Sequence, residues 1–297
     1  MFILLLVAIV LVMLISPFAR YYILHPITCI KNTVSDIYKY YKHKEYNICK
    51  EYGKVFMFVA SGAKAFGSGK TLSMVAYIRC LYRKYNNLDV WDDETQSFVK
   101  QKIIIVSNVE LYDVPYIPFV GRQQFVDIEK IPHTEHDIIL FCIDEASTEF
   151  NSRQYKDNLP TQFLEKLLQV RKHKCSLLLT SQRFNFTDKV LRQICGTVTT
   201  CRMKWRIVML QDYDAYTLEN CSNTEMIAPY STRFFFADDA LFKSYDTTFT
   251  VAKLKEQLNE NDLLSTEEIL ARIGEESGGV YNVENRLKKR FRERKKR

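Results

Sequence analysis

The chain has 297 residues, a formal net charge of +7, and 47% hydrophobic side chains, which is enough to bury one full α/β core with residues left over at each end. Its eight cysteines are scattered from Cys29 to Cys221 without a C-x-x-C pair. This excludes a disulfide framework or a zinc site and indicates reduced, mostly buried thiols. The charge is concentrated at one end, because residues 286–297 carry nine Lys or Arg against one Glu.

The chain starts with an apolar segment, since residues 1–15 contain no charged side chain. A stretch of about 19 residues is just long enough to cross the hydrocarbon core of a membrane as a helix. No basic residue precedes the stretch, and Pro17 stands where a signal peptide needs a small residue. We therefore predict a retained transmembrane anchor over residues 1–19, in preference to a cleaved signal peptide or a buried core helix.

The flanks of this segment predict its orientation. Basic residues follow the segment, beginning with Arg20 and Lys31, and none precedes it. The positive-inside bias then places the bulk of the chain in the cytoplasm, as a single-pass protein of the inner or plasma membrane of a cell. Residues 20–50, rich in Tyr, Lys and Ile, are predicted to form a juxtamembrane helix or connector.

A phosphate-binding loop is the first chemical motif. An apolar strand at 54–60 is followed by Gly67-Ser68-Gly69-Lys70-Thr71 and by a helix predicted over 70–85. The glycines let backbone N–H groups cradle phosphates at the start of the helix. Lys70 would reach the terminal phosphates, and Thr71 would supply a hydroxyl to Mg²⁺. The strict pattern G-x-x-x-x-G-K-[ST] has glycine where this chain has Lys64.

The second motif ends another buried strand. After a polar, loop-like stretch at 88–101 and a strand at 103–106, the apolar run 138–143 ends in Asp144-Glu145. Asp144 is predicted to hold the metal, and Glu145 is placed to polarise the attacking water. The two motifs in this order, each at a strand end, predict a nucleotide-hydrolysing P-loop site.

Later elements supply further candidates. A helix predicted at 160–172 and a strand at 176–180 place Gln182 at the strand end where α/β sheets bind ligands, as a sensor of the γ-phosphate. The candidates for stabilising transition-state charge, from the same or a neighbouring chain, are Arg153, Arg171 and Arg192. The alternation of apolar with other residues from 196 to 211 predicts antiparallel strands at one edge of the sheet.

These elements predict an α/β fold of the P-loop NTPase type: a mostly parallel sheet covered by helices, antiparallel edge strands and one N-terminal transmembrane helix. The predicted segments are an anchor at 1–19, a connector at 20–50, a P-loop ATPase domain at 51–245, a helical region at 246–280 and a basic tail at 281–297.

The tail is predicted to bind nucleic acid through Lys288, Lys289, Arg290, Arg292 and Arg294, with lipid headgroups or plain solvation as alternatives.

The order of motifs resembles the zonular occludens toxin-like family, the assembly ATPases of filamentous bacteriophages, which is similar in turn to the FtsK/HerA group. The resemblance covers about residues 52–195 and rests on the phosphate loop, strand-Ser107-Asn108, Asp144-Glu145-Ala146, Asn151-Ser152-Arg153, Arg171-Lys172-His173-Lys174 and strand-Thr180-Ser181-Gln182. Familiar members of the family carry their membrane span after the ATPase domain, whereas the span predicted here precedes it.

The resemblance implies a membrane-bound motor that uses ATP and Mg²⁺ to export single-stranded phage DNA through the host membrane. It also implies a homo-oligomeric ring and phage coat or export proteins as partners, with membrane lipid contacted by the N-terminal helix. Two alternatives stay open: a cellular or plasmid DNA translocase of the FtsK/HerA type, and a membrane scaffold that binds nucleotide without hydrolysis.

Overall fold

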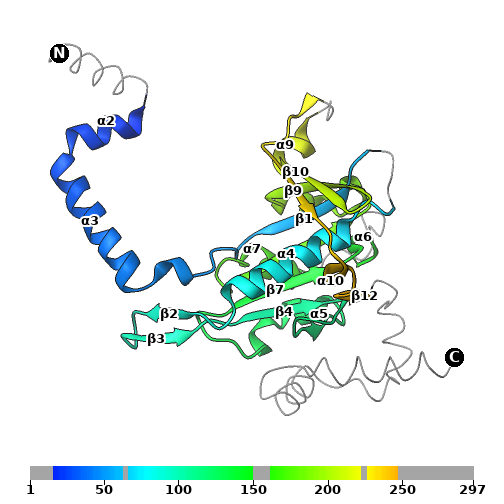
Figure 1. Ribbon diagram of the computed structural model, residues 1–297, viewed down its shortest axis with the longest axis horizontal. Helices are drawn as coiled ribbons and strands as arrows, with labels where there is room; N and C mark the ends of the chain where they lie inside the picture. The colour runs from blue at the N-terminus through cyan, green and yellow to red at the C-terminus, as the bar shows by residue number, and fades with distance from the viewer. Residues whose placement is uncertain (1–15, 63–65, 150–160, 222–225, 247–297) are drawn as a thin grey trace. The chain divides into compact units, whose positions relative to one another are not determined.

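The computed structural model describes residues 16–62, 66–149, 161–221 and 226–246 (Figure 1). Their contacts define two units, the first made of residues 16–48 and 89–100 and the second of the other described residues. The predicted anchor therefore lies outside the described residues except for its last four positions. Within the described ranges, no helix has both the length and the apolar character that a membrane crossing requires.

The first unit consists of helices and a β hairpin. Its elements are α2 (Pro17–Leu24), α3 (Pro26–Lys42), the 3₁₀ turn η1 (Glu45–Asn47), and the antiparallel strands β2 (Asp89–Asp92) and β3 (Ser97–Lys100). The hairpin is held to η1 because the Asn47 side chain donates a 2.8 Å hydrogen bond to the carbonyl of Asp89. The loop predicted at 88–101 is thus wrong: Trp91 and Phe98 pair across the strands, with ring centroids 5.2 Å apart.

The second unit is built on an eight-stranded sheet in the order β11-β10-β9-β1-β8-β7-β4-β6. Its parallel part comprises β1 (Val55–Ala60), β4 (Ile103–Ser107), β6 (Ile117–Pro118), β7 (Ile138–Ile143), β8 (Cys175–Ser181) and β9 (Thr197–Lys204). β10 (Ile207–Asp214) and β11 (Ser231–Phe236) extend it antiparallel at one edge. The predicted mostly parallel sheet with antiparallel edge strands is confirmed.

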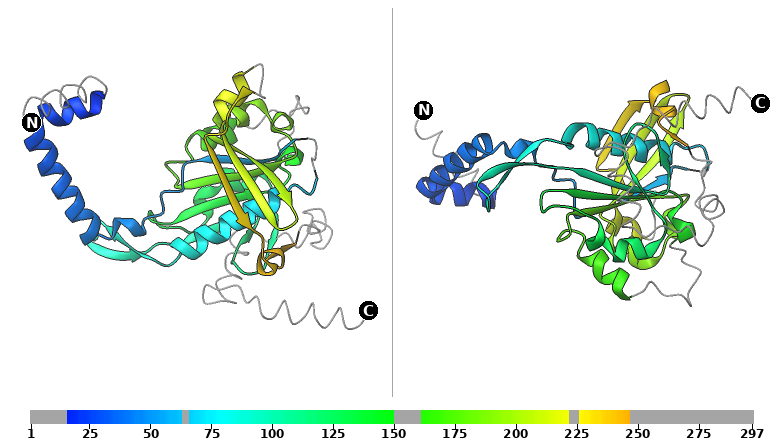
Figure 2. Two further views of the ribbon diagram at one scale, coloured as in Figure 1. Left: turned by 45° about the horizontal axis from the view of Figure 1, so that its top comes forward. Right: turned by 90° about the horizontal axis from the view of Figure 1, so that it is seen from below.

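Helices cover both faces of this sheet. α4 (Lys70–Tyr85) packs on one face, where it shares a buried cluster with Phe58, Leu140 and Leu178. The other face, with Met57, Phe141 and Leu177, is covered by α5 (Arg122–Val126), α7 (Thr161–Leu168), α8 (Lys189–Ile194) and α9 (Ala215–Asn220). The right-hand view of Figure 2 shows α4 (cyan) and the green helices on opposite sides of the strands. Alternate residues of each strand thus enter the two cores.

Short elements complete the unit. They are β5 (Glu110–Leu111), which pairs antiparallel with β12 (Tyr245–Asp246), the turns η2 (Ile128–Lys130) and η3 (Phe184–Phe186), α6 (Ala146–Glu149) and α10 (Asp239–Phe242). Because β1, β8, β7 and β4 are parallel neighbours, the residues that follow them meet at one edge of the sheet. This carboxyl edge is where open α/β sheets bind ligands.

Candidate nucleotide site

The phosphate loop leaves β1 at this carboxyl edge and leads into α4. Gly62, Gly67 and Gly69 have left-handed backbones, with φ of +68°, +66° and +86°. L-residues with a side chain rarely adopt these angles, so the sharp turns of the loop require glycine. Gly69 is the N-cap of α4, where a Cβ would lie 3.4 Å from Cβ of Met203 on β9. Lys64 lies outside the described residues.

Ser68 and Lys70 occupy the part of the loop next to the helix start. Ser68 is 5% exposed, and its buried hydroxyl has no hydrogen-bond partner among the described residues. A buried hydroxyl without a partner is costly, and a bound anion would provide one. Lys70 is the first residue of α4, where helix N–H groups also favour negative charge. The loop therefore fits a phosphate group.

A direct contact joins the two motifs. The Thr71 hydroxyl lies 2.9 Å from Asp144 Oδ1 and 3.1 Å from Oδ2, and it donates to this carboxylate. Both groups are hard oxygen ligands of the kind that Mg²⁺ prefers, usually with water and substrate phosphates completing its shell. The described residues contain no cluster of three or more His, Cys, Asp or Glu that would bind a metal ion alone. The pair thus fits a magnesium ion that arrives with a nucleotide.

Two residues that received no role in the sequence analysis hold Asp144 in place. The Asn108 side chain, just after β4, accepts the Asp144 N–H at 2.7 Å and donates to its carbonyl at 2.9 Å. On the other side, the buried Thr180 hydroxyl of β8 donates to Asp144 Oδ1. The sequence signal that could have identified both residues is their position, because each lies near the carboxyl end of a strand adjacent to β7 or just after it.

Glu145 is exposed at the same edge. Its N–H donates to the Thr180 hydroxyl at 2.9 Å, and its backbone is left-handed, with φ of +50°. This conformation is uncommon for a residue other than glycine, asparagine or aspartate and costs about 1–3 kcal/mol. The hydrogen bond that the Glu145 N–H donates to Thr180 fixes this backbone and so sets the direction in which the Glu145 carboxylate leaves the strand end.

Gln182 and Arg183 follow the end of β8. Gln182 is half-buried at the carboxyl edge, in agreement with the position predicted for it. Arg183 Nη1 donates a 2.7 Å hydrogen bond to the carbonyl of Gly62 at the start of the phosphate loop. Sequence reasoning did not single out Arg183, although it directly follows the predicted sensor. The contact ties the end of β8 to the loop.

Tyr245 of β12 is also close to Asp144. Burial, followed by the negative charge of Asp144, raises the pKa of Tyr245 to about 12. The phenol therefore stays protonated at neutral pH and adds no charge beside the carboxylates.

The predicted role of Arg171 needs correction. Arg171 lies against Gly53, where a Cβ on the glycine would be 2.8 Å from Cβ of Arg171, and the Gly53 N–H donates to the carbonyl of Cys175. These residues precede β1 and β8, so Arg171 is at the amino edge, about 20 Å of strand away from the phosphate loop. Arg171 cannot act in the site of its own chain. A role in the site of a neighbouring chain stays a prediction.

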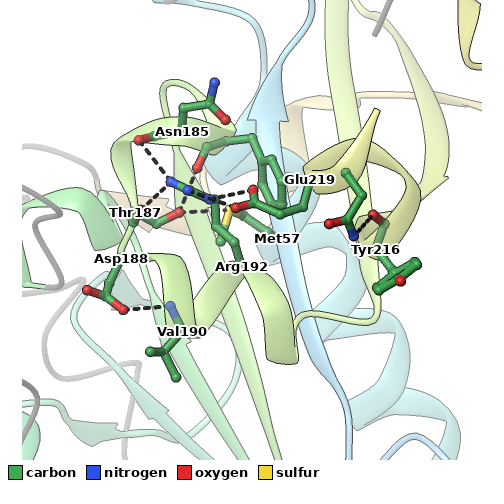
Figure 3. A network of polar contacts seen from close by, with 10 residues as sticks. Met57, Asn185, Thr187, Asp188, Val190, Arg192, Tyr216 and Glu219 are labelled. Atoms are coloured by element: carbon green, nitrogen blue, oxygen red, sulfur yellow. Dashed lines mark hydrogen bonds and ion pairs between the residues drawn. The ribbon is translucent and has the colours of Figure 1, made fainter. Parts of the chain in front are cut away.

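Arg192 is engaged elsewhere, and Arg153 lies outside the described residues. Arg192 binds Glu219 through Nε at 2.7 Å and Nη2 at 3.0 Å, and Nη1 donates to the carbonyls of Asn185 and Thr187 (Figure 3). Thr187 in turn donates to Met57 Sδ. These contacts make Arg192 a link between α8, α9 and η3. Its role at the site of the same or a neighbouring chain stays a prediction. The predicted nucleic-acid residues at 288–294 lie outside the described residues.

The parallel sheet, the glycine loop at the end of its β1 strand, and the Thr71–Asp144 contact define a P-loop NTPase fold. The family model for zonular occludens toxin (Zot) matches residues 117–251, which include β7 and β8 but not the phosphate loop. The predicted resemblance to the zonular occludens toxin-like family is thus confirmed over these residues, which are less than half of the chain.

Solved structures with a similar fold include the N-terminal domain of zonular occludens toxin from Neisseria meningitidis, at 14% identity and a TM-score of 0.42 over 66% of this chain and all of that one. The genome packaging NTPase B204 from Sulfolobus turreted icosahedral virus 2, solved with ATP-gammaS, is similar at 10% identity and a TM-score of 0.40, over 62% of this chain and 98% of that chain. EssC (ATPases 2 and 3) from Geobacillus thermodenitrificans is 12% identical, with a TM-score of 0.36 over 75% of this chain and 44% of that chain. No curated protein matches the sequence.

Proposed function

We propose that the chain is an Mg²⁺-dependent ATPase. The observation that carries this proposal is the Thr71–Asp144 contact at the foot of the phosphate loop, supported on both sides by Asn108 and Thr180. A strand-end aspartate with two dedicated orienting residues has little structural use. It is the arrangement that a metal-dependent phosphoryl transfer requires.

Each residue of the site has a distinct task in this proposal. Gly67, Ser68, Gly69 and Lys70 bind the phosphates. Thr71 and Asp144 would hold a magnesium ion, which would supply positive charge against the phosphate oxygens. Glu145 orients the attacking water and accepts its proton. Gln182 contacts the γ-phosphate or that water, so that its position reports hydrolysis.

ATP hydrolysis by the full chain in detergent tests this proposal. We expect Lys70→Ala and Glu145→Gln each to lower kcat by at least about 100-fold, because electrostatic and general-base contributions of this kind have that size. Glu145→Gln should retain nucleotide binding. Matched controls are Lys54→Ala and Glu129→Gln, which change exposed residues away from the carboxyl edge.

The outcome also separates the ATPase from a scaffold that binds nucleotide without hydrolysis. Hydrolysis that survives in both Lys70→Ala and Glu145→Gln would contradict the assigned site. Tight nucleotide binding by the unmodified chain without turnover would contradict the ATPase and favour a nucleotide-binding membrane scaffold.

We further propose that this ATPase is anchored in the inner or plasma membrane of a host cell, with most of the chain in the cytoplasm, and drives assembly or export of a filamentous single-stranded DNA phage. The apolar, uncharged residues 1–15 and the Zot-like sequence support this role. The partners would be a ring of identical chains, single-stranded DNA, phage coat or export proteins, and membrane lipid. Carbonate extraction of membranes tests the anchor. The chain should stay with the membrane pellet, and charged substitutions in residues 1–15 should release it into the supernatant.

The export role has its own test. Phage release from cells that carry the Lys70→Ala variant should fall to background while phage DNA still replicates. Normal release would contradict the role in export and leave the ATPase assignment intact.

A further inference from the structure

The antiparallel extension of the sheet has an outer face with an unusual composition. The register aligns Ile207 with both Lys204 and Phe236, and Met209 with both Arg202 and Phe234, so these residues point to one side. The remaining residues of this outer face are Thr200, Trp205 in the β9–β10 turn, Gln211 and Thr232. None of the ten is acidic.

Three aromatic rings on the outer face are open to solvent. Trp205 is 73% exposed, Phe234 64% and Phe236 56%, while Arg202 and Lys204 beside them are also exposed. The rings of Trp205 and Phe236 contact each other edge to face, with centroids 5.7 Å apart and an interplanar angle of 73°. Exposed aromatic groups clustered in this way mark an interaction surface.

We propose that this outer face binds single-stranded nucleic acid, a placement that rests on the proposed function. Unpaired bases stack on aromatic side chains whatever their sequence, and cations next to the rings neutralise phosphates of the strand. The face offers both groups and no carboxylate that would repel a polyanion. A duplex buries the faces of its bases, so the outer face discriminates in favour of a single strand.

The inner face of the same strands contacts the phosphate loop. A Cβ at Gly69 would lie 3.4 Å from Met203 Cβ and 3.8 Å from Val208 Cγ1, so the start of α4 packs directly on β9 and β10. Close packing transmits small shifts instead of absorbing them. A change of the loop on nucleotide binding therefore reaches β9, which carries Arg202 and leads into the turn with Trp205.

The test is binding of fluorescein-labelled oligo(dT) to the full chain, measured by fluorescence anisotropy over a range of salt concentrations. The double variant Phe234→Ala/Phe236→Ala should bind at least about tenfold more weakly with an unchanged salt dependence, because stacking is lost and phosphate contacts remain. Arg202→Gln/Lys204→Gln should lower the slope of log K against log salt by about 1.4. Phe236→Trp should retain the affinity of the unmodified chain.

Tyr216→Ala is the matched control, since Tyr216 is 72% exposed on α9 and is not one of the ten residues of the outer face. The affinity of this variant should not change. The same measurements on a chain with Lys288, Lys289 and Arg290 changed to glutamine separate the contribution of the outer face to DNA binding from that of the basic tail.

Two results would overturn the proposal. One is an affinity of the Phe234→Ala/Phe236→Ala variant equal to that of the unmodified chain. The other is a loss of binding that follows a change of oligomeric state, seen by light scattering, which would make the edge strand β11 a contact between copies of the chain. ATP hydrolysis without DNA is measured in parallel. A chain that hydrolyses ATP but does not bind DNA through the outer face would contradict this proposal and leave the ATPase assignment intact.

Discussion

The Asn108 side chain binds both backbone polar groups of Asp144: it accepts from the N–H at 2.7 Å and donates to the carbonyl at 2.9 Å. A side-chain amide can replace a neighbouring strand in this way because it carries one acceptor and two donors in a plane. The contact extends the pairing of β4 with β7 by one residue and brings Asp144 opposite Thr71.

Replacing Asn108 with alanine should lower kcat for ATP by at least about tenfold and destabilise the fold by about 1–3 kcal/mol, because the backbone groups of Asp144 lose their partners. Asn86→Ala is the control: the Asn86 side chain accepts the N–H of Ile103 at 3.0 Å, at the opposite edge of the sheet. It should cost similar stability and leave kcat unchanged. Equal kcat losses in the two variants would show that Asn108 acts through stability alone.

Thr180→Val should impair hydrolysis more than folding. The substitution keeps the shape of the side chain but removes the hydroxyl that joins the Glu145 N–H to the Asp144 carboxylate. We expect kcat to fall at least about tenfold and Thr180→Ser to restore it, since the serine hydroxyl can make both bonds.

A buried threonine–aspartate pair elsewhere serves as the control for Thr180. Thr199 donates to Asp212 at 2.7 Å between β9 and β10. Thr199→Val should lower the melting temperature without affecting kcat. An active Thr180→Val enzyme would contradict the role assigned to this hydroxyl.

Arg192→Lys should destabilise the chain and leave catalysis intact. The side chains of Arg192 and Glu219 are 14% and 12% exposed, and lysine cannot reproduce the two-pronged contact between them. Breaking such a buried pair costs about 3 kcal/mol. Denaturant unfolding of Arg192→Lys, Glu219→Gln and the double variant would measure the coupling. A loss of kcat at unchanged stability would instead make Arg192 a catalytic residue.

The cysteines should divide sharply in their reactivity toward a thiol reagent. Burial raises the pKa of Cys175, Cys195 and Cys201 to about 12 and raises that of Cys142 well above its ordinary value. Since the thiolate is the reactive form, a pKa near 12 leaves about one part in ten thousand ionised at pH 8. These four thiols should react only as fast as the chain unfolds.

Cys80 and Cys221 are exposed, so they should react within minutes and faster as the pH rises from 7 to 9. The absorbance of the coloured product that the reagent releases counts the cysteines that have reacted. Cys80→Ser should lower the number of fast-reacting thiols by one. Rapid labelling of the buried cysteines at pH 8 would contradict the packing of the two cores.

Local patterns predicted much of the sheet and the loop. The helix expected over 70–85 is α4 from Lys70 to Tyr85, since its apolar spacing and its loop were both visible in the sequence. The buried strand ending at Asp144 is β7, in which every residue is buried. Such segments are determined by residues adjacent in the chain, which is why a sequence suffices to locate them.

Residues whose roles depend on strand order were harder to predict. Asn108 and Thr180 reach Asp144 only because β4 and β8 flank β7, a pairing that no local pattern contains. Arg171 follows a helix and precedes β8, as predicted, but its separation from the phosphate loop was missed because the start of a parallel strand lies at the amino edge of the sheet. The β2–β3 hairpin was missed because its alternation is short and its turn, Asp93 to Gln96, is polar like a loop.

The position of β1 in the sheet has a consequence for the order in which the protein folds. Both neighbours of β1 come from the later part of the chain: Lys54 donates to Ser176, 122 residues away, and Cys195 donates to the carbonyl of Val55, 140 residues away. Closing loops of this length is slow and must precede any gain from pairing. During synthesis β1 therefore cannot pair until β8 and β9 have left the ribosome, and the phosphate loop lacks its supporting strands until then.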